Sequence, residues 1–151
     1  MARAFGPGYY IRPEKPLVLP DDSEPEPDIV GLRGRPRDYR RQYPTHQEAL
    51  LVLEVSRATL AYDQGEKASL YAEAGIEDYW ILNLRDRQLE VRREPALLAT
   101  GRYGYRTLRL FTPGMEVSPL ADPAIMIEVS ELLPPAAELD TAGQAGTAGE
   151  P

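Results

Sequence analysis

The spacing of apolar residues changes along the chain in a way that predicts a mixed α/β fold. Residues 49–55 read A-L-L-V-L-E-V, an apolar run broken only by Glu54, which is typical of a central strand covered on both faces. From about residue 61 to residue 74 the spacing becomes helical, and Gly75 is placed to end that helix. We therefore expect a buried strand followed by a helix that packs on the same sheet.

Further strands are predicted on both sides of this unit. Residues 78–84 and 88–92 flank a polar turn, which indicates an antiparallel hairpin, and residues 103–111 alternate as a strand does. A last short strand is expected at 125–127, before a helical turn that ends at Leu133. The N-terminal part has shorter strand signals, at residues 9–12, 17–19 and 29–32.

The length of 151 residues suits one domain. We predict that this domain spans residues 1–135, and that residues 136–151, which are small and polar, form a disordered tail because they have little apolar surface to bury. Residues 33–46 contain Gly34, Pro36 and Pro44 and are predicted to form a long loop.

Composition excludes several classes of protein. With no cysteine and a single histidine, His46, the chain has no disulfide framework, thiol nucleophile or multi-histidine metal site, so any metal is expected to bind oxygen. There is no G-x-S-x-G motif and no glycine-rich phosphate loop after a strand. No apolar run is long enough to span a membrane and no signal peptide is recognisable, so the expected location is cytoplasmic.

The chain has a formal net charge of −7, and its charged residues are unevenly distributed along the sequence. Acidic residues crowd residues 21–28, whereas the following stretch holds five arginines against the single acid Asp38. The net charge argues against binding nucleic acid by bulk electrostatics, but the arginine-rich stretch could contact backbone phosphates. The alternative is a solvated loop. The candidate phosphate-binding residues are Arg33, Arg35, Arg37, Arg40 and Arg41.

Glu54 is the most informative residue, since a carboxylate in a core strand is costly unless it is paired or binds a metal. Asp28 stands at the entrance of the preceding strand, and the two carboxylates can converge if those strands are neighbours. Two carboxylates without histidine or cysteine match the oxygen preference of Mg²⁺. The alternatives are a structural ion pair for Glu54 and a turn residue for Asp28.

Lys67 is one of only two lysines among 17 cationic residues. It lies three, four and seven residues before the apolar Leu70, Tyr71 and Ala74, so we expect it to face the sheet. The alternative is a surface pair with Asp63, four residues earlier on the same helix face.

Five segments together resemble the Uma2 family, also called the DUF820 putative restriction endonucleases. They read P-E-P-D-I-V at 25–30, L-V-L-E-V-S at 51–56, Y-D-Q-G-E-K at 62–67, L-Y-A-E-A-G-I-E-D-Y-W-I-L at 70–82, and the following L-E-V-R-R. The resemblance covers roughly residues 8–133. It implies a fold of the PD-(D/E)xK nuclease-like superfamily, with a restriction-endonuclease-like mixed sheet flanked by helices, and here with a shortened N-terminal part.

The resemblance also implies roles for individual residues. Asp28 and Glu54 match the family's two acids, while the superfamily's usual lysine position holds Ser56, which points to Lys67 on the next helix as the displaced lysine. Asp63 matches the acid of the same helical motif. Asp28 and Glu54, with the backbone carbonyl of Val55, would hold Mg²⁺ or Mn²⁺.

The expected function is therefore metal-dependent hydrolysis of phosphodiester bonds in DNA, with Asp28, Glu54 and Lys67 as the catalytic residues. The alternative is a catalytically inactive nuclease-like domain that acts as a binding or assembly module. Dimerisation is one way to bury the edge of its sheet, so a homodimer belongs to this expectation.

Overall fold

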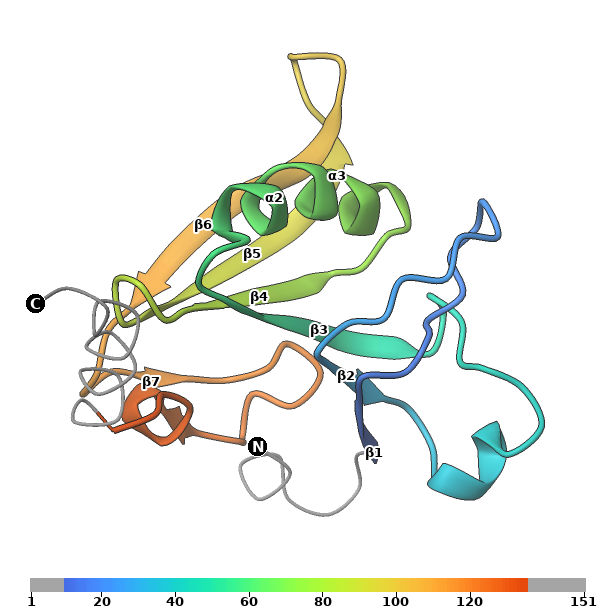
Figure 1. Cartoon of the computed structure of the whole chain (residues 1–151), viewed down its shortest axis with the longest axis horizontal. Coiled ribbons are helices and arrows are strands. Elements are labelled where there is room, and N and C mark those ends of the chain that lie inside the picture. The colour runs from blue at the N-terminus through green and yellow to red at the C-terminus, as the bar shows by residue number, and fades with distance from the viewer. Residues whose placement is uncertain (1–9, 136–151) are drawn as a thin grey trace, which may run out of the picture.

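A six-stranded mixed sheet forms the centre of the computed structural model, which describes residues 10–135 (Figure 1). The order in the sheet follows the sequence, and all neighbouring strands are antiparallel except β3 and β4, which are parallel. The predicted α/β class is thus confirmed, while the predicted tail lies outside the described residues. The strands are β1 (Tyr10–Pro13), β2 (Ile29–Leu32), β3 (Ala49–Ser56), β4 (Asp78–Asn83), β5 (Gln88–Leu97) and β6 (Tyr103–Phe111).

Two short helices, α2 (Leu60–Gln64) and α3 (Glu66–Glu73), make the crossover that the parallel pair β3–β4 requires. The single helix predicted here was wrong, because Gly65 adopts φ −103° and ψ −88° and interrupts it. Gly75 ends α3 as predicted. At φ +80° its N–H donates to the carbonyl of Ala72, and the N–H of Ile76 donates to that of Tyr71, which is the paired bonding of a Schellman motif.

Both faces of β3 are buried along most of the strand, as its apolar run predicted. Val52 packs on the side of α3, whereas Leu51 and Leu53 pack into a second core on the opposite side. That second face is covered by the small ladder of β7 (Glu116–Val117) and β8 (Ile127–Glu128) and by the 3-10 helix η2 (Val129–Glu131). The helices α2 and α3 therefore lie on one face of the sheet only.

The segments around β2 are less regular than predicted. Residues 17–19 do not form a strand, because only Val18 forms a bridge, with Thr45, although Leu17 and Leu19 are buried in the core. The predicted arginine-rich loop contains the 3-10 helix η1 (Pro36–Tyr39). The hydroxyl of Tyr39 donates a hydrogen bond to the carbonyl of Arg33, which ties η1 to the end of β2.

β5 is longer than predicted, whereas β6 has its predicted bounds, and the two strands form a hairpin that bends over the helices. β5 continues to Leu97, and Glu94 adopts φ +62° within it. Beyond this bend, Tyr105 reaches the helix side of the sheet, where its hydroxyl donates to the carbonyl of Ile76 at 2.7 Å. Figure 1 shows the end of the hairpin rising past α2 and α3. None of the helices in residues 10–135 is long and apolar enough to cross a membrane.

Candidate acid and lysine site

Glu54 lies under α3 and is 2% exposed. Its Oε1 accepts a hydrogen bond from the backbone N–H of Asp28 at 3.0 Å. Its Oε2 accepts from Lys67 Nζ at 2.5 Å and from the hydroxyl of Tyr71 at 3.0 Å. Three donors therefore compensate the burial of this carboxylate, as burial of a charge demands.

Asp28 is placed beside Glu54 by the register of β2 on β3, in which Ile29 pairs with Leu53. Its Oδ2 accepts a hydrogen bond from the N–H of Val55 at 2.7 Å. The two acids are thus interlocked, since each carboxylate accepts a backbone N–H from the other acid or from its neighbour. The predicted adjacency of the two strands is confirmed.

Lys67 faces the sheet, as its place among the apolar residues of the helix predicted. Tyr71 stands one turn later on α3, so the two side chains reach the same oxygen of Glu54. The alternative pair with Asp63 was wrong, because Asp63 instead accepts a hydrogen bond from the hydroxyl of Thr59 at 2.9 Å. Asp63 is buried, and its negative charge acts on Lys67 without a direct ion pair.

The electrostatics of the pair follow from its burial. Burial raises the pKa of the Glu54 carboxyl group, and the hydrogen bonds from Lys67 and Asp28 offset only part of that rise. Burial alone would lower the pKa of Lys67, but the hydrogen bond and the charge of Glu54 outweigh it, so the pKa of Lys67 is raised. A positive charge near Glu54 therefore favours its ionised form.

Ser56 and Val55 complete the predicted set. Ser56 shares the helix face of β3 with Glu54 and is fully buried, and its Oγ has no hydrogen-bond partner among residues 10–135. Val55 contributes its N–H to Asp28, and its side chain is 39% exposed on the other face. A role for the Val55 carbonyl remains a prediction.

The donor set suits a hard divalent cation. Mg²⁺ in proteins is typically held by one or two carboxylates, with water and phosphate completing its shell. Asp28 and Glu54 supply two such carboxylates side by side. Within the described part of the chain, no group of three or more histidine, cysteine, aspartate or glutamate residues could hold a metal, so protein ligation would rest on these two.

The arginine-rich loop is not brought to this site. Asp28 immediately precedes β2 and Arg33 immediately follows it, so the loop begins at the opposite end of the strand. At about 3.3 Å per residue, the two backbone positions are roughly 16 Å apart. All five predicted arginines are exposed. Phosphate binding by this loop remains a prediction, at a distance from the acids.

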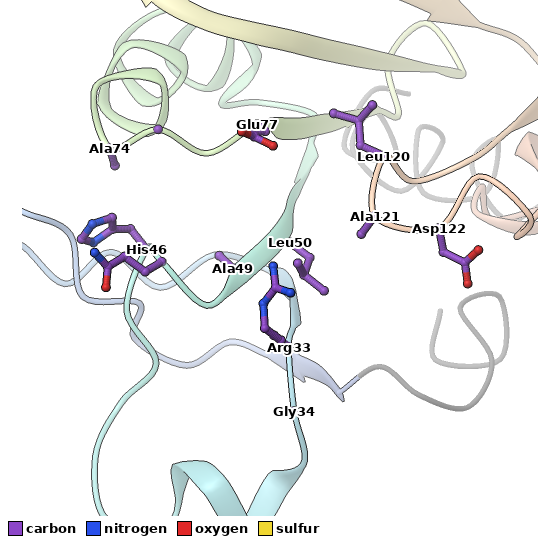
Figure 2. Close-up of a pocket in the computed structure, with 12 residues that line it drawn as sticks. Arg33, Gly34, His46, Ala49, Leu50, Ala74, Glu77, Leu120, Ala121 and Asp122 are labelled. Carbon is purple, nitrogen blue, oxygen red and sulfur yellow. The ribbon is translucent and has the colours of Figure 1, made fainter.

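A pocket of about 900 Å³ lies at the same end of the sheet as the arginine-rich loop. Figure 2 shows Arg33 entering the space from one wall, with Glu77 on the opposite wall and His46 to one side. Neither Asp28 nor Glu54 lines it. The acid and lysine site is therefore separate from this hollow.

Comparison with known proteins shows the family of this chain and supports its fold. The Uma2 family, described as putative restriction endonucleases, matches residues 2–130. The chain belongs to the Uma2 family. Its structure is similar to the crystal structure of a putative nuclease belonging to DUF820 from Anabaena variabilis, with a TM-score of 0.59 and 12% identity, over 83% of this chain and 68% of that chain. At this identity the similarity shows the fold alone. No curated protein matches the chain.

Two features of this Uma2 domain were missed by sequence reasoning. Tyr71 was assigned to the apolar stripe of the helix, although its hydroxyl binds Glu54. Glu90 is 2% exposed and accepts hydrogen bonds from Gln64, Asn83 and Arg92. A signal for Glu90 existed, because the sequence L-E-V around Glu54 recurs at 89–91. Ile81 pairs with both glutamates, so they flank it on one face of the sheet.

Proposed function

We propose that this Uma2 protein is a metal-dependent endonuclease that hydrolyses phosphodiester bonds in DNA. Membership of a family described as putative restriction endonucleases supports the reaction class. The observation that carries the proposal is the direct contact of Lys67 with Glu54, beside Asp28. A lysine absent from its usual strand position thus reaches the same acid from a helix.

The roles follow from charge and exposure. Asp28 and Glu54 would hold a divalent ion, which when bound lowers the pKa of water and polarises a phosphate. Lys67 is 19% exposed, so its ammonium group can turn from Glu54 toward a phosphate and stabilise the negative charge that develops there. Tyr71 keeps the Glu54 carboxylate in place during that movement.

A second candidate is a binding or assembly module without catalysis. It is favoured by the complete hydrogen bonding of Glu54, because a buried carboxylate with three donors also satisfies the requirements of a structural ion pair. In that case the ion pair with Lys67 already satisfies Glu54, and a divalent ion would not bind there favourably. A homodimer remains compatible with both candidates.

A metal-titrated cleavage assay on supercoiled, linear and branched DNA tests the proposal. We expect cleavage with Mg²⁺ or Mn²⁺, and none with Zn²⁺ alone or in excess EDTA, because the candidate ligands are hard oxygens without imidazole or thiolate. Undiminished cleavage in EDTA would contradict the metal requirement. No cleavage of any DNA with any of these ions would favour the binding module.

A further inference from the structure

The outer part of the β5–β6 hairpin is a cationic surface in an acidic protein. Residues 95–115 contain no acid, although the chain has 24 acidic residues and a net charge of −7. Three arginines in this segment, Arg102, Arg106 and Arg109, are exposed. By contrast, Arg92 and Arg93 nearer the sheet centre are neutralised by ion pairs with Glu90 and Asp78.

A groove of about 280 Å³ separates this hairpin from the start of α3. Its helix wall includes Gln64 and the small residues Gly65, Ala68 and Ser69, and its hairpin wall includes Arg102, Tyr103 and Leu108. Tyr103 is 39% and Leu108 52% exposed. The groove therefore combines a positive charge with an accessible aromatic ring and an apolar side chain.

The groove is close to the candidate catalytic site along the helix. Lys67 lies between Gly65 and Ser69 in sequence, so the same turn of α3 presents Lys67 to Glu54 on one side and forms the groove wall on the other. A chain that crosses the start of α3 would contact both. The bend at Glu94 brings the hairpin into this position.

We propose that this surface binds a single strand of nucleic acid, an inference that rests on the proposed function and extends it to substrate class. Exposed arginines bind phosphates without reading sequence, and an exposed tyrosine ring offers a stacking platform for an unpaired base. In a duplex the faces of the bases are already stacked on one another, so a single strand is the better partner for Tyr103.

A second copy of the chain is the less suitable occupant. β6 is the last strand of the sheet, and antiparallel pairing of two β6 edges would be the simplest way to join two copies. That interface would contain three arginines from each copy and no acid between residues 95 and 115 of either. Like charges without compensation destabilise such pairing, whereas a polyanion is attracted.

Fluorescence anisotropy with labelled oligothymidine, in EDTA and over a range of salt concentrations, tests the inference on the full chain. The double variant Arg102→Ala/Arg106→Ala should bind at least about tenfold more weakly. The slope of log affinity against log salt concentration, the salt slope, should become shallower by about 1.4, since each phosphate contact on a single strand contributes about 0.7. Tyr103→Ala should weaken binding with the slope unchanged. Arg85→Ala, an exposed arginine in the turn before β5, is the matched control and should bind as wild type.

The outcomes separate this inference from the proposed function. Binding by the double variant equal to wild type, or tighter binding of a duplex of the same length than of oligothymidine, overturns the inference. So does a loss of dimer in the double variant, measured by sedimentation, without a loss of DNA affinity. Binding that depends on Arg102 and Arg106 in a protein that cleaves no DNA supports the inference and overturns the proposed function. Melting temperatures of the variants verify that they are folded.

Discussion

The ammonium group of Lys67 lies 2.5 Å from Oε2 of Glu54, although the two residues are 13 positions apart in sequence. The contact exists because α3 lies on the face of the sheet to which Glu54 points, and Tyr71 donates to the same oxygen from the next turn of the helix. With the N–H of Asp28 on the other oxygen, each of the three hydrogen bonds described for the Glu54 carboxylate comes from a donor group. This environment makes Glu54 sensitive even to a conservative substitution.

Glu54→Gln should lower the free energy of unfolding without metal by about 3 to 5 kcal/mol, the usual cost of breaking a buried pair from one side. An amide offers only one acceptor oxygen, so its NH₂ group would face a donor. Urea unfolding at pH 7 measures the loss, with the exposed Glu73→Gln on α3 as control. A loss no larger than that of the control would contradict the hydrogen bonding described here.

Tyr71→Phe and Tyr79→Phe form a matched pair of variants. Both tyrosines are fully buried. Tyr71→Phe removes the hydrogen bond from the hydroxyl to Glu54, and Tyr79→Phe removes the one to the carbonyl of Asp63. Each should cost about 1 kcal/mol in unfolding free energy. Only Tyr71→Phe should reduce the cleavage rate, because only Tyr71 holds a candidate catalytic group. Equal rates for the two variants in a plasmid-nicking assay would remove Tyr71 from the site.

Replacing Arg37, Arg40 and Arg41 with alanine tests the arginine-rich loop. If the three side chains contact phosphates of duplex DNA, the affinity falls and the salt slope decreases by about 2.7, at about 0.9 per contact. Because the loop begins at the far end of β2 from Asp28, the cleavage rate at saturating DNA should not change. An unchanged salt slope would show that these arginines are only solvated.

The Tyr39 hydroxyl provides a pH-dependent test of how η1 is anchored. Burial, together with the charge of Glu48, raises the pKa of Tyr39 from 10.0 to about 12. The unfolded chain therefore loses this proton first, and the contribution of Tyr39 to stability declines as pH rises from about 10 to about 12. The unfolding free energy of wild type should fall more between pH 8 and pH 11 than that of Tyr39→Phe. Parallel declines would mean that Tyr39 is accessible to water.

Much of the fold could be predicted from local pattern. Local spacing of apolar residues was enough to predict the strand around Glu54, the helix before Gly75 and the strand at 103–111. The end of the helix could also be predicted, because Gly75 is a local signal. The break at Gly65 could not be predicted, because a glycine within a helix is tolerated and only packing decides whether it bends the chain. The bend at Glu94 is of the same kind, since a non-glycine residue with positive φ has no sequence signal.

The sequence predicted which residues form the candidate site better than it predicted how they are arranged. The rarity of lysine and the presence of an acid in a core strand indicated Lys67 and Glu54, and resemblance to Uma2 connected them. The hydroxyl of Tyr71 was hidden by its apolar ring, which fits an apolar stripe equally well. The separation of the arginine-rich loop from Asp28 follows from the extended strand between them, so the expected strand at 29–32 already implied it.

Asp28→Asn tests the central claim most directly, because it removes a candidate metal ligand at little structural cost. Only Oδ2 of Asp28 accepts a described hydrogen bond, from the N–H of Val55, and the oxygen of asparagine can accept the same bond. Thermal melts with and without Mg²⁺, together with plasmid cleavage, are the measurement. The account predicts that Mg²⁺ raises the melting temperature of wild type, while metal-free Asp28→Asn melts like metal-free wild type, is not stabilised by Mg²⁺ and does not cleave. Equal stabilisation of both proteins by Mg²⁺, or cleavage by Asp28→Asn at the wild-type rate, would contradict the account.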